Sequence, residues 1–260
     1  MKVIENVAQW RDVRESLTGS IGFVATMGAL HGGHASLLAR SAGENDITVL
    51  SIFLNATQFN NPADLTCYPK TLERDLTLAC RLGADYVITP SNEEIYADQF
   101  RYQIQETQFS RELCGAHRDG HFTGVLTVVM KLLNIVQPRR AYFGEKDFQQ
   151  YQLIKDMCEA FFMDVDIVSC ETVREDDGLA LSSRNELLDA PARETAGVLN
   201  ELIRTDLDDA AVAAALTEAG FCVDYIVTKQ RRRFAAATLS CEQGNVRLID
   251  NVTLATLSDA

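Results

Sequence analysis

The chain has 260 residues, of which 47% are hydrophobic and 23% charged, a composition typical of a soluble globular protein. Its formal net charge of −13 excludes the broad basic face that a duplex nucleic-acid partner requires. The 7 cysteines form no CxxC pair, which argues against a zinc ribbon and favours reduced thiols in a cytoplasmic protein. No apolar run approaches the roughly 18 residues that a membrane span needs, and the charged N-terminus does not resemble a signal peptide.

Short apolar strands alternate with helices over the first two thirds of the chain. The predicted elements, in chain order, are strand 21–26, helix 34–42, strand 46–54, helix 69–84, strand 85–89, helix 124–138, strand 140–144, helix 147–162 and strand 164–170. This alternation predicts an α/β fold with a Rossmann-like, mainly parallel sheet and helices on both of its faces.

The pattern changes after Cys170. A loop at 174–185 leads to predicted helices at 191–204 and 208–219 and then to strands near 222–228 and 245–251. We therefore expect two domains. The first is the Rossmann-like domain, residues 1–170, and the second is a smaller C-terminal α+β domain, residues 171–260.

The stretch ATMGALHGGHASL joins the strand at 21–26 to its helix and contains His31 and His34. Ligands of parallel sheets bind beyond the carboxyl ends of the strands, and the N-terminus of a helix attracts anions. Two imidazoles spaced i, i+3 on a first helical turn point the same way and can donate hydrogen bonds to phosphate. Gly32 and Gly33 would let a ligand approach the backbone. The stretch therefore predicts a phosphate site, although it is neither a P-loop nor a dinucleotide fingerprint.

Two other interpretations of the histidine pair stay open. The imidazoles can be structural, each satisfied by backbone groups of the turn. They can also bind zinc, but a zinc site needs a third ligand, and neither an HExxH motif nor a cysteine pair supplies one.

Three further loops place polar or cationic side chains at the same predicted edge of the sheet. FGEKDFQQ sets Lys146 at a helix start, and DGLALSSRN sets Arg184 beside two serines. FLNATQF puts the neutral amides of Asn55 and Gln58 after a strand end. Each stretch alone also fits an ordinary polar loop. An acidic chain that gathers cations at one edge is nevertheless expected to bind a nucleotide.

Four motifs together resemble the pantoate–β-alanine ligase family of the HIGH-motif nucleotidyltransferase superfamily, in order and in spacing: TMGALHGGHASL, FLNATQF, GHFTGVLTVVMKLLNIVQPRRAYFGEKDFQQ and DGLALSSRNELL. The resemblance is close over roughly residues 1–190, and DYIV and RLIDN continue it weakly. It implies that pantoate attacks the α-phosphorus of ATP to give pantoyl adenylate and pyrophosphate, and that β-alanine then displaces AMP to give pantothenate. It also implies Mg²⁺ with the phosphates, a cytoplasmic homodimer, and no nucleic-acid or membrane partner.

The resemblance assigns roles to individual residues. His34 is the expected proton donor, and the other expected catalytic residues are His31, Lys146 and Arg184. The expected ATP-binding residues are Met27, Gly28, Ala29, Leu30, His31, Gly32, Gly33, His34, Gly144, Glu145, Lys146, Asp147, Val173, Leu181, Ser182, Ser183 and Arg184, with Val173 lining the adenine pocket. Those expected to bind pantoate or β-alanine are Gln58, Gln150, Asn55, Arg118 and His121. Asp75 is a candidate Mg²⁺ contact, for which a solvated helical aspartate is the alternative. The first domain would hold nucleotide and pantoate, and the second would act as a lid.

The chain departs from the family pattern at three places. Ala56 stands where the family usually has Pro, Asp119 replaces Pro in RPGHF, and KQRRRFAAA replaces a TLxP region. These departures bear on the β-alanine end and the lid, and none affects the phosphate-handling residues. Two other functions stay open. Nucleotidyl transfer to a phosphorylated acceptor would share the histidine turn but not FGEKDFQQ. A non-catalytic nucleotide-binding module would not need the intact catalytic residues.

Overall fold

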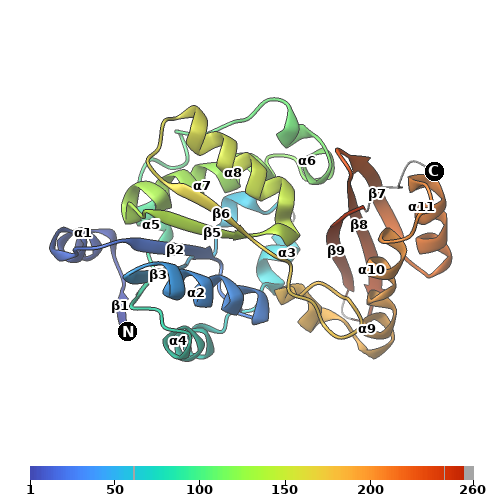
Figure 1. The fold of residues 1–260 in the computed structure, drawn as a ribbon, viewed down its shortest axis with the longest axis horizontal. Coiled ribbons are helices and arrows are strands. Elements are labelled where there is room, and N and C mark those ends of the chain that lie inside the picture. Colours follow the sequence, from blue (N-terminus) through green and yellow to red (C-terminus); the bar gives the residue numbers. More distant parts are fainter. Residues whose placement is uncertain (61, 243, 255–260) are drawn as a thin grey trace. The chain divides into compact units, whose positions relative to one another are not determined.

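The chain folds into two compact units in a computed structural model that describes residues 1–60, 62–242 and 244–254 (Figure 1). The first unit comprises Met1–Glu145 and Gln149–Glu171, and the second comprises Lys146–Phe148 and the chain from Thr172 onward. The units thus differ from the predicted domains 1–170 and 171–260 mainly at Lys146–Phe148, which group with the C-terminal part. No helix in the described parts of the chain is long and apolar enough to cross a membrane.

The first unit is built on a six-stranded sheet with the order β1-β4-β3-β2-β5-β6, and each of its five strand pairs is parallel. The strands are β1 (Lys2–Ile4), β2 (Ile21–Thr26), β3 (Ile47–Ile52), β4 (Tyr86–Ile88), β5 (Arg140–Gly144) and β6 (Asp166–Cys170). The Rossmann-like parallel sheet predicted from the sequence is confirmed. Because the strands are parallel, the carboxyl ends of the neighbours β3, β2 and β5 lie at one edge.

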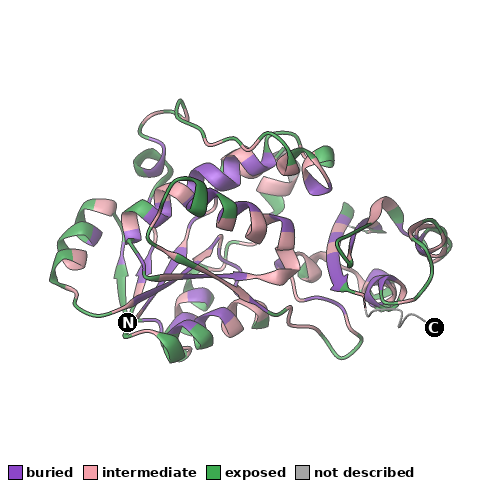
Figure 2. Cartoon of the chain, turned by 45° about the horizontal axis from the view of Figure 1, so that its top comes forward, coloured by how far each residue is buried: buried purple, intermediate pink, exposed green. Residues whose placement is uncertain are grey.

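Helices cover both faces of this sheet (Figures 1 and 2). They are α1 (Val7–Ser16), α2 (Gly32–Glu44), α3 (Pro62–Cys67), α4 (Leu72–Arg81), α5 (Asn92–Ile95), α6 (Cys114–His117), α7 (His121–Val136) and α8 (Phe148–Ala160), with 3-10 turns η1 (Ala56–Gln58), η2 (Phe109–Arg111) and η3 (Glu145–Asp147). On one face, Leu38 of α2 and Ala79 of α4 pack with Val87 of β4. Tyr86, which points to the opposite face, meets Trp10 of α1, and the indole nitrogen donates to the carbonyl of Ile135 in α7 at 2.9 Å.

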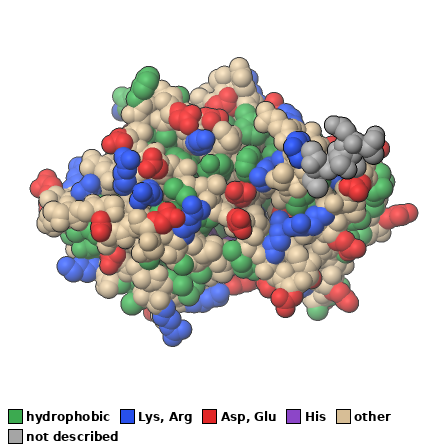
Figure 3. Space-filling view, in the orientation of Figure 1, with side chains coloured by type: hydrophobic (Ala, Val, Ile, Leu, Met, Phe, Trp, Pro, Cys, Tyr) green, Lys and Arg blue, Asp and Glu red, His purple; other side chains and the backbone are tan. Residues whose placement is uncertain are grey.

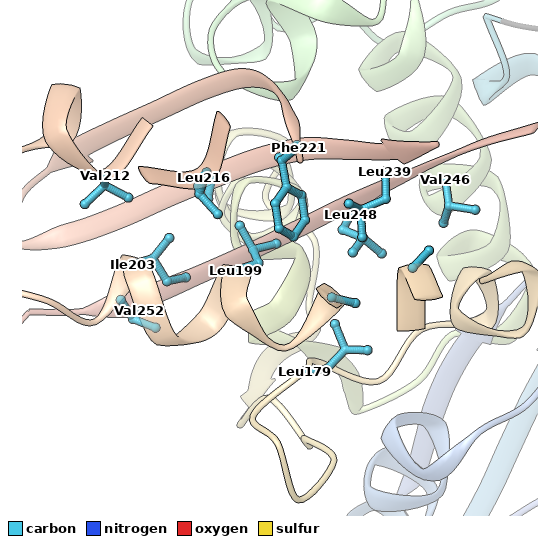
Figure 4. Packing of buried hydrophobic residues seen from close by; sticks show 14 residues of the cluster. Leu179, Leu199, Ile203, Val212, Leu216, Phe221, Leu239, Val246, Leu248 and Val252 are labelled. Carbon is cyan, nitrogen blue, oxygen red and sulfur yellow. The ribbon is translucent and has the colours of Figure 1, made fainter. Parts of the chain in front are cut away.

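The second unit contains a separate three-stranded antiparallel sheet, β7-β8-β9. Its elements are η4 (Ser183–Leu187), α9 (Ala190–Ala196), α10 (Val198–Ile203), α11 (Asp209–Glu218), β7 (Cys222–Lys229), β8 (Arg232–Cys241) and β9 (Gly244–Thr253). Figure 4 shows its core, in which Leu199 of α10 and Leu216 of α11 point toward Phe221 and toward Leu248 of the sheet. This helix-and-sheet layer is the α+β arrangement that the sequence predicted.

Two features of the second unit differ from the prediction. The predicted helix 191–204 is two helices, α9 and α10, which are separated at Gly197. A Cβ on Gly197 would lie 2.9 Å from a carboxylate oxygen of Asp177, so this junction has no room for a side chain. The central strand β8 was not predicted. Its buried middle is Ala235, Ala236 and Ala237, and alanine is depleted in strands, so the stretch lacks the usual sequence signal.

Candidate active site

The turn that follows β2 is anchored by a buried carboxylate of α4. Asp75, only 1% exposed, accepts hydrogen bonds from the backbone N–H groups of Ala29 and Leu30, both at 2.8 Å. The hydroxyl of Thr71 donates to the same carboxylate at 3.1 Å. Ala29 has φ +49° and Gly28 has φ +86°, in the left-handed region that an alanine seldom adopts. Asp75 therefore fixes an uncommon backbone conformation in the segment expected to meet ATP.

Asp75 does not fit the Mg²⁺ contact that the resemblance implied. Three hydrogen bonds occupy three of the about four acceptor positions of its carboxylate, and burial excludes the solvated alternative as well. Within residues 1–60, 62–242 and 244–254, no group of three or more His, Cys, Asp or Glu side chains could hold a metal ion. A contact between Asp75 and Mg²⁺ is therefore not part of the function proposed below.

His31 and His34 cap the helix that follows the turn. His31 Nδ1 accepts a hydrogen bond from the backbone of Gly33 at 3.1 Å, and His34 Nδ1 accepts one from the backbone of His31 at 3.4 Å. The ring centroids lie 4.1 Å apart, and a Cβ on Gly33 would lie 2.8 Å from the His31 ring. Because Nδ1 of each ring is an acceptor, each neutral imidazole carries its hydrogen on Nε2. The structural interpretation is therefore correct for one nitrogen of each ring, while Nε2 of each ring is the atom that can donate to an anion.

Asn55 is buried beside Gln58 rather than exposed to a substrate. Its Nδ2 donates to Gln58 Oε1 at 2.9 Å, and its Oδ1 accepts from the hydroxyls of Thr57 and Tyr96 at 2.8 and 2.6 Å. Asn55 is 1% exposed, whereas Gln58 is half-buried. With the oxygen of its amide held, Gln58 presents its NH₂ group as a donor. Asn55 thus orients one of the predicted pantoate-binding residues.

Arg118 and His121 both contact the backbone carbonyl of Gln58. His121 Nδ1 lies 2.8 Å from that oxygen, Arg118 Nη2 donates to it at 3.3 Å, and Arg118 Nη1 lies 3.0 Å from His121 Nε2. Since a guanidinium group can only donate, His121 Nε2 accepts and Nδ1 carries the hydrogen. The structure therefore brings together three residues that the resemblance assigned to the substrates.

The FGEKDFQQ segment is shared between the two units. Gly144 and Glu145 end the β5 region of the first unit, and Lys146 and Asp147 belong to the second. The Lys146 side chain is 17% exposed, and its Nζ lies 3.8 Å from a carboxylate oxygen of Asp147. This lysine is therefore not part of a fully solvated charge run. Gln150 is half-buried on the first turn of α8.

Sequence reasoning missed Gln149, the neighbour of Gln150. Its side chain is buried, its Oε1 accepts from the backbone of Cys114 at 3.1 Å, and its Nε2 donates to two carbonyls of the segment 109–112 at 2.7 and 2.8 Å. Gln149 thereby fastens this segment to α8. A lone glutamine has no sequence signature that distinguishes this role from a place on the helix surface.

In the second unit, the DGLALSSRN loop is a hairpin. The backbone N–H of Leu181 donates to the carbonyl of Val173 at 3.0 Å, which sets these two predicted ATP contacts side by side. Ser182 then caps η4 by accepting from the backbone of Arg184 at 3.3 Å. Ser183 is buried and Arg184 is half-buried. The hairpin thus leads directly into the Ser182–Arg184 segment.

Acidic and basic side chains are interspersed on the face that Figure 3 shows. With charges mixed in this way, we expect an anionic substrate to meet individual cations rather than a field of one sign.

Comparison with known proteins points to one family. A family model described as pantoate-beta-alanine ligase matches residues 2–253. The chain is 49% identical to a pantothenate synthetase of Legionella pneumophila over 256 residues, which are 98% of this chain and 100% of that protein. It is also 49% identical to a pantothenate synthetase of Bdellovibrio bacteriovorus over 253 residues, which are 97% and 99% of the two chains.

Solved structures agree with these relatives. The pantoate-beta-alanine ligase from Francisella tularensis, crystallised with beta-gamma ATP and beta-alanine, matches with a TM-score of 0.92 and 40% identity over 97% of each chain. The pantothenate synthetase from Thermus thermophilus matches with a TM-score of 0.87 and 36% identity, over 97% of this chain and 99% of the other. Because both the family model and the relatives cover nearly the whole length, the chain belongs to the pantoate-beta-alanine ligase family.

Proposed function

We propose that the chain joins pantoate to β-alanine in two steps and that the residues described above carry them out. In the first step, a carboxylate oxygen of pantoate attacks the α-phosphorus of ATP and pyrophosphate leaves. In the second, the amine of β-alanine attacks the carbonyl carbon of pantoyl adenylate, loses a proton, and AMP leaves. Condensation of the two substrates with the use of ATP follows from family membership. The order of steps rests on chemistry, since a carboxylate must become an anhydride before an amine can displace its oxygen.

The observation that carries the proposal is the turn between β2 and α2. Asp75 holds its backbone, and the Nδ1 atoms of His31 and His34 are taken by backbone donors, so that each Nε2 can donate to a phosphate oxygen. Donors fixed before the reaction stabilise the charge that builds up on phosphorus more effectively than donors that must first reorient. In this proposal His31 donates a hydrogen bond from Nε2 to the charge that builds up beside the departing pyrophosphate. His34 protonates pyrophosphate from its imidazolium form, for which Nδ1 exchanges its 3.4 Å hydrogen bond with the His31 backbone for a proton, and the ring is left neutral.

Cations of the second unit supply further positive charge for the phosphates of ATP. Lys146 and Arg184 bind the phosphates, the backbone at Gly144–Asp147 and Leu181–Ser183 contacts ATP, and Val173 lines the adenine pocket. Positive charge rather than a nucleophilic side chain is what the first step needs, because pantoate itself is the nucleophile.

Neutral amides and Arg118 hold the other substrates. Gln58 and Gln150 bind pantoate, and the Arg118–His121 pair on the Gln58 carbonyl receives the carboxylate of β-alanine. The departures from the family pattern at Ala56 and Asp119 are both exposed, so neither replaces a buried contact of this cluster.

The finer properties that the resemblance implies belong to the same proposal. The second unit acts as a lid that shields the adenylate from water, and the chain works as a cytoplasmic homodimer with Mg²⁺ on the phosphates of ATP. Sedimentation of the purified protein, fractionation of cells, and the dependence of turnover on free Mg²⁺ test these three properties separately.

Exchange of labelled pyrophosphate into ATP tests the two-step order. It should require pantoate and should proceed without β-alanine, because the first step is reversible on its own. Exchange that needs β-alanine would overturn the stepwise adenylate, and exchange that ignores pantoate would favour a different acceptor. A chain that binds ATP but shows neither exchange nor product would be a non-catalytic nucleotide-binding module.

A Lys146→Ala variant tests the assignment of charge. It should lose at least about 3 kcal/mol of transition-state stabilisation, as expected for a preorganised charge-stabilising group. Normal exchange in a variant with unchanged circular dichroism would remove Lys146 from the proposed site.

A further inference from the structure

Two neighbouring residues of β9, Asp250 and Asn251, hydrogen-bond to two different parts of the second unit. Asn251 contacts Lys146, which the proposed function assigns to ATP, and Asp250 contacts Arg174 at the base of the hairpin that leads to Arg184. Both side chains are buried, with 3% and 4% of their surface exposed. They lie in the RLIDN stretch, to which the proposed mechanism gives no role. Successive side chains of a strand point to opposite faces, so an adjacent pair can reach two separate segments.

Asn251 holds the backbone of the phosphate-binding lysine. Its Nδ2 donates to the carbonyl oxygen of Lys146 at 3.0 Å, and its Oδ1 accepts from Arg232 Nη1. The guanidinium carbon of Arg232 lies 3.9 Å from the ring centroid of Phe148, and that ring lies 6.0 Å from the ring of Phe234. The segment Lys146–Phe148 is thus fixed to β8 and β9 through both its backbone and its aromatic ring.

Asp250 holds the base of the hairpin that leads to Arg184. Its carboxylate receives two hydrogen bonds from the guanidinium group of Arg174, at 2.6 and 2.9 Å, and one from Asn200 at 2.8 Å. Arg174 also donates to the carbonyl of Gly178 at 2.9 Å, across the hairpin. A bidentate pair with this little exposure, 17% for Arg174 and 2% for the Asp250 side chain, orients both groups strictly.

We propose that Asp250 and Asn251, together with Arg232, are positioning residues that hold the Lys146 segment and the Arg184 hairpin in one rigid frame. The ladder between β8 and β9 places Ala235 opposite Asp250 and Phe234 opposite Asn251, which fixes the frame itself. Two cations must meet the same phosphate chain at the same time, and a small displacement of either one weakens the stabilisation of the transition state. The inference rests on the proposed function, because it assumes that Lys146 and Arg184 bind the phosphates.

The test variant is Asn251→Asp, which keeps the shape and the acceptor for Arg232 but replaces the donor to the Lys146 carbonyl by a second oxygen. We expect the rate of adenylate formation, measured by rapid quench with ATP and pantoate, to fall roughly 10- to 100-fold. The second half-reaction, started from synthetic pantoyl adenylate and β-alanine, should keep its rate within about twofold, because pyrophosphate has already left. A purely structural role would lower the melting temperature or slow both half-reactions equally, and either result without the expected split would overturn the proposal.

Arg232→Met is the second variant, and it keeps the proposal testable if Asn251→Asp does not fold. Methionine retains the apolar contact with Phe148 and loses the hydrogen bond to Asn251, so adenylate formation should fall roughly 3- to 10-fold. The matched control is Arg231→Met, which removes the same charge from the exposed neighbouring position and should leave both half-reactions unchanged. Equal effects of the two arginine variants would mean that overall charge, not position, is responsible.

A double variant separates this inference from the proposed function. If Asn251 acts through Lys146, then Asn251→Asp should cause little further loss in the rate of adenylate formation in a Lys146→Ala background. If the two residues act independently, the fold-losses of the two single variants should multiply in the double variant. A large loss in Lys146→Ala with none in Asn251→Asp would refute only the positioning role. Normal adenylate formation in Lys146→Ala would refute the proposed function itself.

Discussion

His31 and His34 each use one ring nitrogen, Nδ1, to cap α2, and in the neutral rings Nε2 carries the hydrogen. In the proposed function, the same side chains therefore combine capping with catalysis. A substitution that keeps the cap and removes the ability to carry a proton separates the two tasks, and glutamine at position 34 does so. Glutamine is a common third residue of a capping box, because its side-chain oxygen reaches the N-cap backbone N–H.

In His34→Gln, adenylate formation should fall about 100-fold or more, within the range for loss of a general acid, while ATP affinity changes little. Only the transition state develops the charge that the proton neutralises. Rapid-quench measurement of adenylate, with ATP binding followed by calorimetry, checks both expectations. His117→Gln makes the same change on an exposed histidine of α6 and should have no effect. A lower melting temperature with normal chemistry per folded molecule would instead make His34 purely structural.

The buried carboxylate under the turn leads to a second prediction for a single residue. In Asp75→Asn, the single amide oxygen can accept from only one of the backbone N–H groups of Ala29 and Leu30. The NH₂ group then faces the other N–H, and two donors cannot form a hydrogen bond. We expect the free energy of unfolding to drop by about 2–3 kcal/mol and the KM for ATP to rise, because the left-handed turn is no longer held. Urea unfolding and steady-state kinetics measure the two effects. Glu73→Gln, an exposed acid-to-amide change on the same helix, is the control and should alter neither.

The sequence predicted which segments form the candidate site better than it predicted how each side chain is used. Motif order indicated the turn, the lysine and the hairpin. The sequence did not predict that Asp75 and Asn55 are buried and hold neighbouring segments in place. Their hydrogen-bond partners include Ala29 for Asp75 and Gly124 for Asn55, which lie 46 and 69 positions away in the chain. A hydrogen bond over such a separation leaves no local pattern.

At the level of elements, the strands with a clear apolar pattern were predicted closely and the alanine-rich one was not. The bounds of β2 and β5 coincide with the predicted 21–26 and 140–144. In contrast, β8 begins inside a run of arginines, and its second residue, Arg233, is buried and donates to the carbonyls of Ile203 and Thr205. Periodicity predicts a strand when its own side chains carry the pattern. The side chains of β8 carry no such pattern, and pairing with β7 and β9 and packing against the helices determine that this segment is a strand.

Packing between elements also explains a glycine inside α7. A Cβ on Gly124 would lie 2.5 Å from the carbonyl oxygen of Thr57 and 2.7 Å from the backbone nitrogen of Gln58, so η1 can approach the helix only because no side chain is present. Gly124→Ala should therefore displace η1. We expect a loss of stability of about 1–3 kcal/mol from overpacking and a higher KM for pantoate, measured by thermal unfolding and initial rates.

Gly43→Ala in α2 is the control for this change. A Cβ at Gly43 has no neighbour within 4 Å, so the substitution should stabilise the protein by about 0.5–1 kcal/mol through helix propensity alone. If both variants were stabilised, the close approach of η1 to α7 would not constrain the site.

At the scale of the whole molecule, several carboxylates of this acidic chain are held in their ionised form by the fold. The backbone N–H of Ser20 lowers the pKa of Asp46, and that of Ala192 lowers the pKa of Asp189. At Asp98, the hydrogen bond from Lys131 lowers the pKa to about 2. Groups of this kind stabilise the folded state above their unfolded pKa and lose that contribution as the pH falls.

Asp98 makes this acid sensitivity testable because it links two elements that position Asn55. Lys131 Nζ of α7 donates to Asp98 at 2.6 Å and to the carbonyl of Ile95 at 2.8 Å, and it lies 4.7 Å from the ring centroid of Tyr96, whose hydroxyl donates to Asn55. The carboxyl of an unfolded aspartate has a pKa of about 3.9, so the stabilisation by the pair is complete above about pH 5 and is lost as the pH falls from there through about 2.

Asp98→Asn should therefore be less stable than the parent at pH 6, and the difference should shrink toward pH 3, because the parent loses with acid what the variant already lacks. Urea midpoints of both proteins at a series of pH values measure this difference. Asp164→Asn breaks an exposed ion pair with Arg139, which water and salt screen, so its difference from the parent should be small throughout. A difference between Asp98→Asn and the parent that stayed constant from pH 6 to pH 3 would mean that the side chain contributes through packing rather than through its charge. In that case the acid sensitivity of the molecule would have to come from its other carboxylates.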